Sequence, residues 1–79
     1  MDAKLTFQYD RDADILHIST RTPYPGQESE ELDDGVVARL NPATGEVENL
    51  EILFFSTRLQ RSDAFELPVT ADLRVATRG

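Results

Sequence analysis

The sequence contains no cysteine and no tryptophan, and it has one histidine and one lysine among its 79 residues. Without cysteine the chain has no disulfide framework and no thiolate nucleophile. Secreted chains of this size usually need disulfides, so we expect a cytoplasmic location. No apolar run approaches the ~20 residues of a membrane span. The first residues lack the basic and apolar regions of a signal peptide, so we expect neither export nor membrane association.

Basic residues are also scarce, because 8 of them face 15 acidic residues and leave a net charge of −7. Proteins bind nucleic acid largely by neutralising phosphates with Lys and Arg, so direct nucleic-acid binding is not expected. A basic protein partner fits this charge better. The ordinary alternative is that the charge only keeps a small protein in solution.

Alternation of apolar and polar residues predicts four strands, over residues 5–9, 15–19, 36–40 and 46 to about 55. Asp-rich residues 10–14 and residues 41–45 are predicted turns. Val47 and Leu50 fit one face only if an extra residue is inserted, which predicts a β-bulge near Glu48 or Asn49. The alternative is a two-sided strand with Leu53 and Phe55 on its second face.

The remaining segments are less regular. Prolines and a glycine predict an irregular connection over residues 20–35. Residues 56–61 are predicted to form one or two helical turns with Ser56 as N-cap. Residues 65–75 are predicted to close the fold as an extended segment or edge strand. The expected fold is mainly β, a single domain over residues 1–79: a small antiparallel sheet of four to five strands built from hairpins, with one short helix after the fourth strand. The alternative class is α+β.

Three blocks of sequence, at residues 9–18, 30–36 and 45–53, resemble the signatures of the DUF2283 family of small prokaryotic proteins of unknown function. The first is a Tyr-Asp followed by an acidic turn, and the third is a glycine-led strand ending in Leu-Glu-Ile-Leu. The resemblance covers about residues 7–56 and implies an antiparallel sheet. It implies no catalytic residues, and the divergent tail, residues 62–79, falls outside it. His17 stands where the family commonly has Tyr, so it is not expected to be a family-wide catalyst.

Candidate catalytic and metal-binding residues are few. His17 shares a strand face with Ser19, but no nucleophile elbow accompanies this pair. The alternating aspartates of residues 10–14 resemble the start of a calcium loop, but Ile15 and Arg21 stand where glycine and glutamate are needed. No phosphate-binding, dinucleotide-binding or zinc motif occurs. We therefore assign no catalytic residue, metal or cofactor, and do not expect an enzyme.

Tyr9 and Asp10 form a conspicuous pair at the end of the first predicted strand. The Tyr9 ring is expected on the core face with its hydroxyl at the rim, and Asp10 is expected to cap the turn. A small-molecule or divalent-metal-binding protein that uses this acidic turn and the acidic loop over residues 28–34 stays open as an alternative function, with Tyr9, Asp10, Asp14 and His17 as candidate ligand-binding residues.

The leading interpretation is a non-enzymatic interaction or regulatory module. Such a module would bind a basic protein through an exposed acidic loop, in the way that an antidote protein masks a small toxin. The residues of this loop are Glu28, Glu30, Glu31, Asp33 and Asp34. A second apolar sheet face is also expected, formed by Ile15, Val37, Leu53 and Phe55. Because such patches usually mark interfaces, we expect a homodimer unless the C-terminal segment covers this face.

Overall fold

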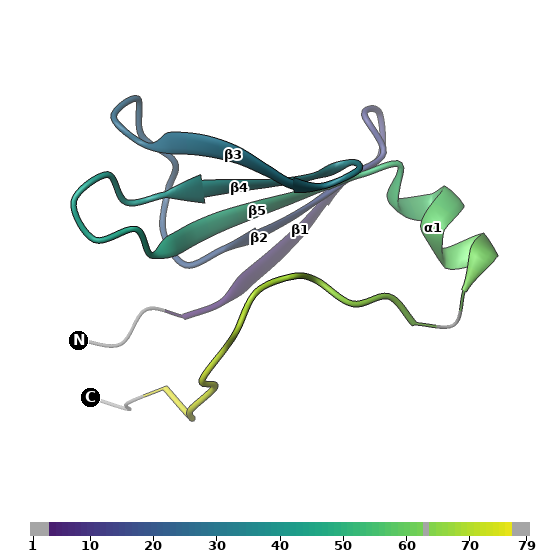
Figure 1. Ribbon diagram of the computed structural model, residues 1–79. Helices are drawn as coiled ribbons and strands as arrows, with labels where there is room; N and C mark the ends of the chain where they lie inside the picture. The colour runs from purple at the N-terminus through teal and green to yellow at the C-terminus, as the bar shows by residue number, and fades with distance from the viewer. Residues whose placement is uncertain (1–3, 63, 77–79) are drawn as a thin grey trace.

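The computed structural model describes residues 4–62 and 64–76, which form one antiparallel sheet followed by a short helix (Figure 1). The strands are β1 (Thr6–Asp10), β2 (Ile15–Ser19), β3 (Glu28–Asp33), β4 (Val36–Leu40) and β5 (Val47–Leu53), and the helix is α1 (Phe55–Arg61). The strand order is β1-β2-β5-β4-β3. The mainly β prediction is confirmed, although the helix follows the fifth strand and not the fourth.

The two turns predicted from Asp, Asn and Gly form by side-chain bonds to nearby backbone. Between β1 and β2, the Asp10 carboxylate accepts bonds from the amides of residues 12 and 13, as expected of its capping role. Between β4 and β5, the Asn41 side chain accepts bonds from the amides of residues 43 and 44. Gly45 then takes a φ of 76°, which a residue without Cβ adopts freely.

The core lies on one face of the sheet, which we call the core face. Cross-strand partners share a face, and Ile52 of β5 pairs with Leu16 of β2 and with Val36 of β4. Leu50 pairs in the same way with Ile18 and Ala38. The fully buried apolar residues are Val36, Ala38, Leu50 and Ile52. The core is therefore thin and concentrated on the two central strands β4 and β5.

The predicted β-bulge is present at Glu48. Arg39 of β4 pairs with Asn49, and the next residue, Leu40, pairs with Val47, so Glu48 is left without a partner on β4. The extra residue brings Val47 and Leu50 onto the core face together, which is why the alternation of the sequence slips at this point.

The prediction of an irregular connection over residues 20–35 is wrong for its second half. Residues 28–33 form the edge strand β3, which pairs with β4 and has a register shift between Glu31 and Asp33. Leu32 is the one apolar residue of this strand, so no alternation predicts it. Backbone pairing with β4 decides its conformation, and charged residues are common on edge strands.

The helix is capped differently from the prediction. Ser56 is not the N-cap, because Phe54 occupies that position with a φ of 54° and no side-chain capping bond. Ser56 lies in the first turn, where its amide and hydroxyl donate to the carboxylate of Asp14. A residue distant in sequence thus satisfies the helix terminus, and no local pattern could have shown it.

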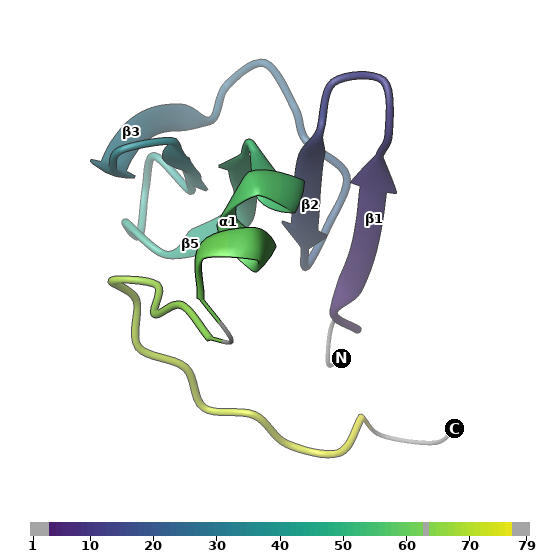
Figure 2. The same cartoon turned by 90° about the vertical axis from the view of Figure 1, so that its right-hand side faces the viewer.

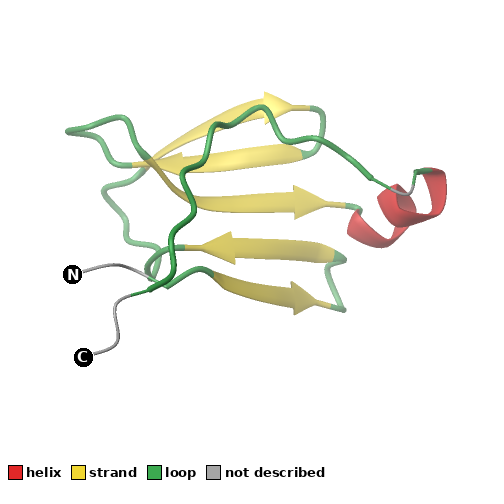
Figure 3. Ribbon diagram, turned by 90° about the horizontal axis from the view of Figure 1, so that it is seen from below, coloured by secondary structure: helices red, strands yellow, loops and turns green. Residues whose placement is uncertain are grey.

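The C-terminal segment, residues 64–76, crosses the core face and contains no strand in its described part (Figure 3). The predicted edge strand is therefore wrong, because the segment runs across the strands and not beside one. Phe65, Leu67 and Val69 are half-buried, whereas Leu73 and Val75 are exposed. Residues 77–79 of the predicted tail lie outside the described residues.

The predicted second apolar face is also corrected. Phe55 lies in α1, and its ring packs against Tyr9 and Phe65 (centroid distances 5.8 and 5.9 Å), so it does not join that face. Ile15 and Leu53 remain cross-strand neighbours there. Figure 2 shows the C-terminal segment passing on one side of the sheet. That side is the core face, because residues 67–73 line a groove with Phe7 and Leu50. Of the two possibilities left open above, the segment therefore does not cover the second face in its described part.

Candidate functional site

The five acidic residues predicted as a partner site lie together on one edge of the sheet. Four of them belong to β3 and Asp34 follows in the turn; all five are exposed: Glu28, Glu30, Glu31, Asp33 and Asp34. In residues 4–62 and 64–76, no ion pair involves any of these carboxylates. We call this set the acidic edge. The residues were predicted in a loop, but four of them lie in a strand, where Glu28 and Glu30 are on one face and Glu31 is on the other.

The acidic edge also has a free backbone side. β3 is the last strand in the order and, within the described residues, pairs with β4 alone. An edge strand presents a row of outward N–H and C=O groups that another extended chain can pair with. The edge therefore combines negative charge with unsatisfied backbone hydrogen-bonding groups.

Tyr9 and Asp14 form a second cluster, which joins the β1–β2 turn to the start of α1. The Tyr9 hydroxyl donates to Asp14 Oδ1 (2.6 Å), and the Ser56 amide donates to the same oxygen (3.0 Å). The Ser56 hydroxyl donates to Oδ2 (2.8 Å), and the Asp14 carbonyl accepts a bond from the Phe55 amide (3.1 Å). As predicted, Tyr9 packs its ring on the core side with its hydroxyl at the rim.

These bonds change the acidity of both partners. The Tyr9 bond, followed by the bonds from Ser56, lowers the pKa of the Asp14 carboxyl. The same bond raises the pKa of the Tyr9 hydroxyl. Asp14 is thus held as an anion by groups that belong to the fold. Its bonds serve to fasten the helix to the hairpin.

His17 lies apart from Asp14, on the second face of the sheet. It pairs across the strands with Gln8 and Glu51, and it lines a shallow depression with Tyr9, Asp10 and Ser19. Glu51 is already ion-paired with Arg39 (2.7 Å). In the part of the chain that the structure describes, no three His, Asp or Glu side chains converge where a metal could bind. Of the predicted set, Tyr9, Asp10 and His17 line this depression, whereas Asp14 does not line it and is bonded to the Tyr9 hydroxyl.

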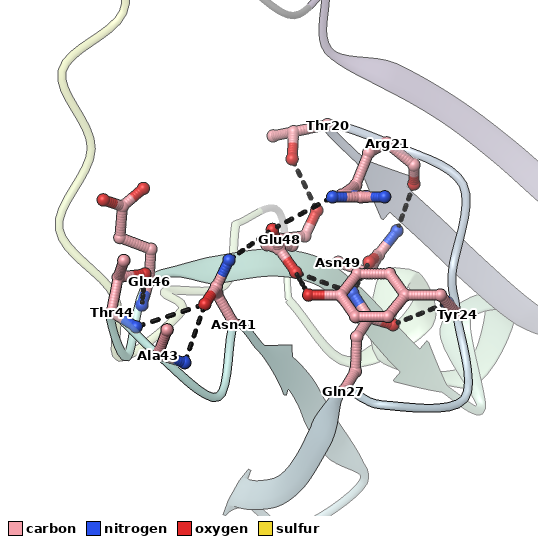
Figure 4. A network of polar contacts seen from close by, with 10 residues as sticks. All are labelled: Thr20, Arg21, Tyr24, Gln27, Asn41, Ala43, Thr44, Glu46, Glu48 and Asn49. Atoms are coloured by element: carbon pink, nitrogen blue, oxygen red, sulfur yellow. Dashed lines mark hydrogen bonds and ion pairs between the residues drawn. The ribbon is translucent and has the colours of Figure 1, made fainter.

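A third cluster, which the sequence did not predict, surrounds Glu48 in the β-bulge (Figure 4). Its Oε1 accepts bonds from the Tyr24 hydroxyl (2.8 Å) and from Gln27 Nε2 (3.0 Å). Its Oε2 accepts a bond from Asn41 Nδ2 (3.4 Å) and lies 3.8 Å from Arg21 Nη1. Bonds from Gln27 and then Tyr24 lower the pKa of the Glu48 carboxyl, and the pKa of Tyr24 is raised in return.

Asn49 continues this network on the second face of the sheet, where it pairs with Ser19 and Arg39; it is the one buried polar residue among those described. Its Nδ2 donates to the Arg21 carbonyl (2.7 Å), and its Oδ1 accepts a bond from Gln27 (2.8 Å). Arg21 lies over the Tyr24 ring, with its guanidinium carbon 4.3 Å from the centroid. The network therefore fixes the connection between β2 and β3 to the sheet. The bulge predicted at Glu48 or Asn49 was the one sequence signal that pointed here.

The network is complete in itself. No buried side-chain nitrogen or oxygen of the described residues is left without a partner. Among the described residues, no helix is long and apolar enough to cross a membrane.

Comparison with known proteins adds the family. No curated protein and no solved structure matches the chain. The family model described as "Protein of unknown function (DUF2283)" matches residues 6–56. This match spans all five strands and ends at Ser56, the residue that joins α1 to the Asp14 carboxylate. The chain belongs to the DUF2283 family.

Proposed function

We propose that this protein is a non-enzymatic interaction module that binds a basic protein partner through the acidic edge. The observation that carries the proposal is the set of exposed carboxylates on an edge strand with no ion pairs in the described residues. The Tyr9–Asp14 and Glu48 clusters make their hydrogen bonds within the fold, whereas the carboxylates of the acidic edge have no ion pair in the described residues.

The acidic edge offers two kinds of attraction to such a partner. Its carboxylates, together with the net charge of −7, speed the approach of a basic protein and favour it over acidic ones. The free backbone side of β3 can then pair with an extended segment of the partner, which is a recurring mode of peptide recognition. Side chains of Lys or Arg on that segment would lie opposite the glutamates of β3.

The regulatory form of this function is an antidote-like one, in which the module covers the basic surface of a small toxin or similar protein. Its support is the charge and size of the chain and the exposure of the acidic edge. A covered basic surface could no longer meet an anionic target such as nucleic acid, because binding to phosphates depends on free Lys and Arg.

The test is capture of partners by the tagged chain in its native cells, read by mass spectrometry. We compare the natural chain with the double variant Glu28→Lys/Glu31→Lys. Neither side chain makes a hydrogen bond or ion pair in the described residues, so folding should be kept. The matched control is Asp12→Lys/Glu66→Lys, which changes the net charge equally at exposed positions away from β3.

We expect one basic protein to be retained by the natural chain and by the control. It should be released by about 0.5 M salt, where the screening length falls to a few ångströms, and lost from the β3 variant. Equal retention by both variants would contradict the role of the acidic edge.

A further inference from the structure

An open groove lies between the core face and the C-terminal segment, with a volume of about 1270 Å³. We call it the apolar groove. It is lined by Phe7, Val47 and Leu50 on the sheet side and by Leu67, Val69 and Leu73 on the segment side. The segment crosses the core face (Figure 3), and the groove lies between the two.

The groove leaves large apolar side chains accessible to solvent. Phe7 is 61% exposed, Val47 is 37% exposed and Leu73 is 78% exposed. Exposed apolar residues that gather in a concave surface mark binding sites more often than scattered ones do. Direct packing of the C-terminal segment on these side chains would have buried them and enlarged the thin core. Their exposure therefore needs another explanation.

The charged residues of the groove are of one sign. Glu30, Glu46 and Asp72 line it with exposed side chains, and Glu48 lines it from within its network. Asp72 is ion-paired with Arg74 (2.8 Å), so Glu30 and Glu46 are the lining carboxylates that have no ion pair in the described residues. None of the described residues that line it is Lys or Arg. A second copy of this acidic chain seated here would bring like charges together. The favoured occupant is therefore apolar on one side and basic on the other.

We propose that the apolar groove binds an amphipathic basic segment of the partner protein. Apolar side chains of that segment would contact Phe7, Val47 and Leu73, while flanking Lys or Arg would meet Glu30 and Glu46. Docking of an amphipathic segment in an apolar groove is an established mode of recognition. The inference rests on the proposed function for the existence of a basic partner, but it names a surface distinct from Glu28 and Glu31.

The test uses two synthetic peptides of equal length and charge. One alternates leucine and lysine with amphipathic helical spacing, and the other has serine in place of each leucine. Binding to the full chain is measured by isothermal titration calorimetry, and the contacted residues are mapped by NMR amide shifts. We expect the leucine–lysine peptide to bind at least about tenfold more tightly. Its shifts should fall on β1, β5 and residues 67–73.

Matched variants distinguish binding in the groove from nonspecific hydrophobic binding to the rest of the surface. Phe7→Ser/Leu73→Ser removes two exposed groove residues and should abolish the tenfold preference. The control Phe54→Ser/Leu59→Ser removes two residues that are 64% and 55% exposed but lie outside the groove, and it should keep that preference. Equal loss in both variants, or equal affinity for the two peptides, would overturn the inference.

The remaining outcomes distinguish this inference from the proposed function. Peptide shifts confined to Glu28, Ser29 and Glu31, which do not line the groove, would overturn the groove and leave the acidic edge in place. Shifts that appear in the groove when the protein alone is concentrated would show a second copy as its occupant, and would also overturn the inference. Groove binding, combined with full retention of the native partner by Glu28→Lys/Glu31→Lys, would instead refute the proposed function alone.

Discussion

Replacing Asn49 by alanine tests whether the network behind the β-bulge holds the fold together. Asn49 is 3% exposed, and its side chain joins the Arg21 carbonyl (2.7 Å) to the Gln27 amide (2.8 Å). The variant Asn49→Ala removes both bonds and leaves the Arg21 carbonyl without this partner. The Gln27 side chain keeps its hydrogen bond to Glu48 in this variant, so it loses one of its two bonds from Nε2.

The magnitude follows from these two bonds. Each one contributes about 1–1.5 kcal/mol, and leaving a buried group unpaired costs a similar amount, so we expect a loss of about 2–3 kcal/mol in the free energy of unfolding. A chain of 79 residues, at about 0.05–0.15 kcal/mol per residue, has a total of roughly 4–12 kcal/mol. The melting temperature should fall by about 8–24 °C, at about 4–8 °C per kcal/mol for this size.

The assay is urea denaturation followed by circular dichroism, with Gln8→Ala as the control at an exposed position of the same sheet. A surface change of that kind should stay within about 0.5 kcal/mol of the natural chain. Adding Gln27→Ala to Asn49→Ala should cost less than the two single losses added together, because the bond between them is counted in each. A loss for Asn49→Ala no larger than that of the control would refute the structural role of the network.

Three further predictions follow from the turns, the carboxylates and the exposed apolar surface. The folded pKa values of Asp14 and Glu48 are lowered, so their stabilisation is present above the unfolded pKa and is lost as pH falls through the folded pKa. In urea denaturation from pH 7 to pH 2, Asp14→Asn and Glu48→Gln should each flatten the acidic loss of stability, and an unchanged slope would contradict this. Gly35→Ala should destabilise the protein by about 1 kcal/mol more than Gly45→Ala does. Both glycines have a positive φ, so the backbone strain is common to the two variants. Only at Gly35 would the added Cβ meet another side chain, because it would lie 2.6 Å from Nη2 of Arg58. Equal losses in thermal denaturation would count against that contact. The homodimer expected from the sequence stays a prediction, and light scattering at tens of micromolar should give twice the monomer mass; a monomer would argue against it.

The part of the fold that burial determines could be predicted from the sequence. Apolar and polar residues alternate along the strands because one face of the sheet is buried. The slip in this alternation between Val47 and Leu50 predicted the bulge at Glu48. The turns at Asp10 and Asn41 could be predicted because their bonds are local. In each case the decisive physical contact lies within a few residues or follows from a period of two.

The features that were missed depend on partners distant in the sequence. β3 forms because β4 offers a backbone edge, and its glutamates have no alternation to show it. Helix α1 begins where Asp14 supplies the capping carboxylate, which lies 42 residues before Ser56. Of the candidate residues, the acidic ones were rightly expected to be exposed. The separation of Asp14 from His17 could not be predicted, because the bonds of Asp14 to Ser56 depend on where α1 lies.

The most direct test of the account is the affinity of the captured basic partner for purified variants, measured by isothermal titration calorimetry at low salt. The account predicts that Glu28→Lys/Glu31→Lys binds at least about tenfold more weakly than the natural chain, a change of about 1.4 kcal/mol. Asp12→Lys/Glu66→Lys, with the same net charge, should lose far less. Equal weakening by the two variants would show that net charge alone attracts the partner, and would contradict a binding site on the acidic edge.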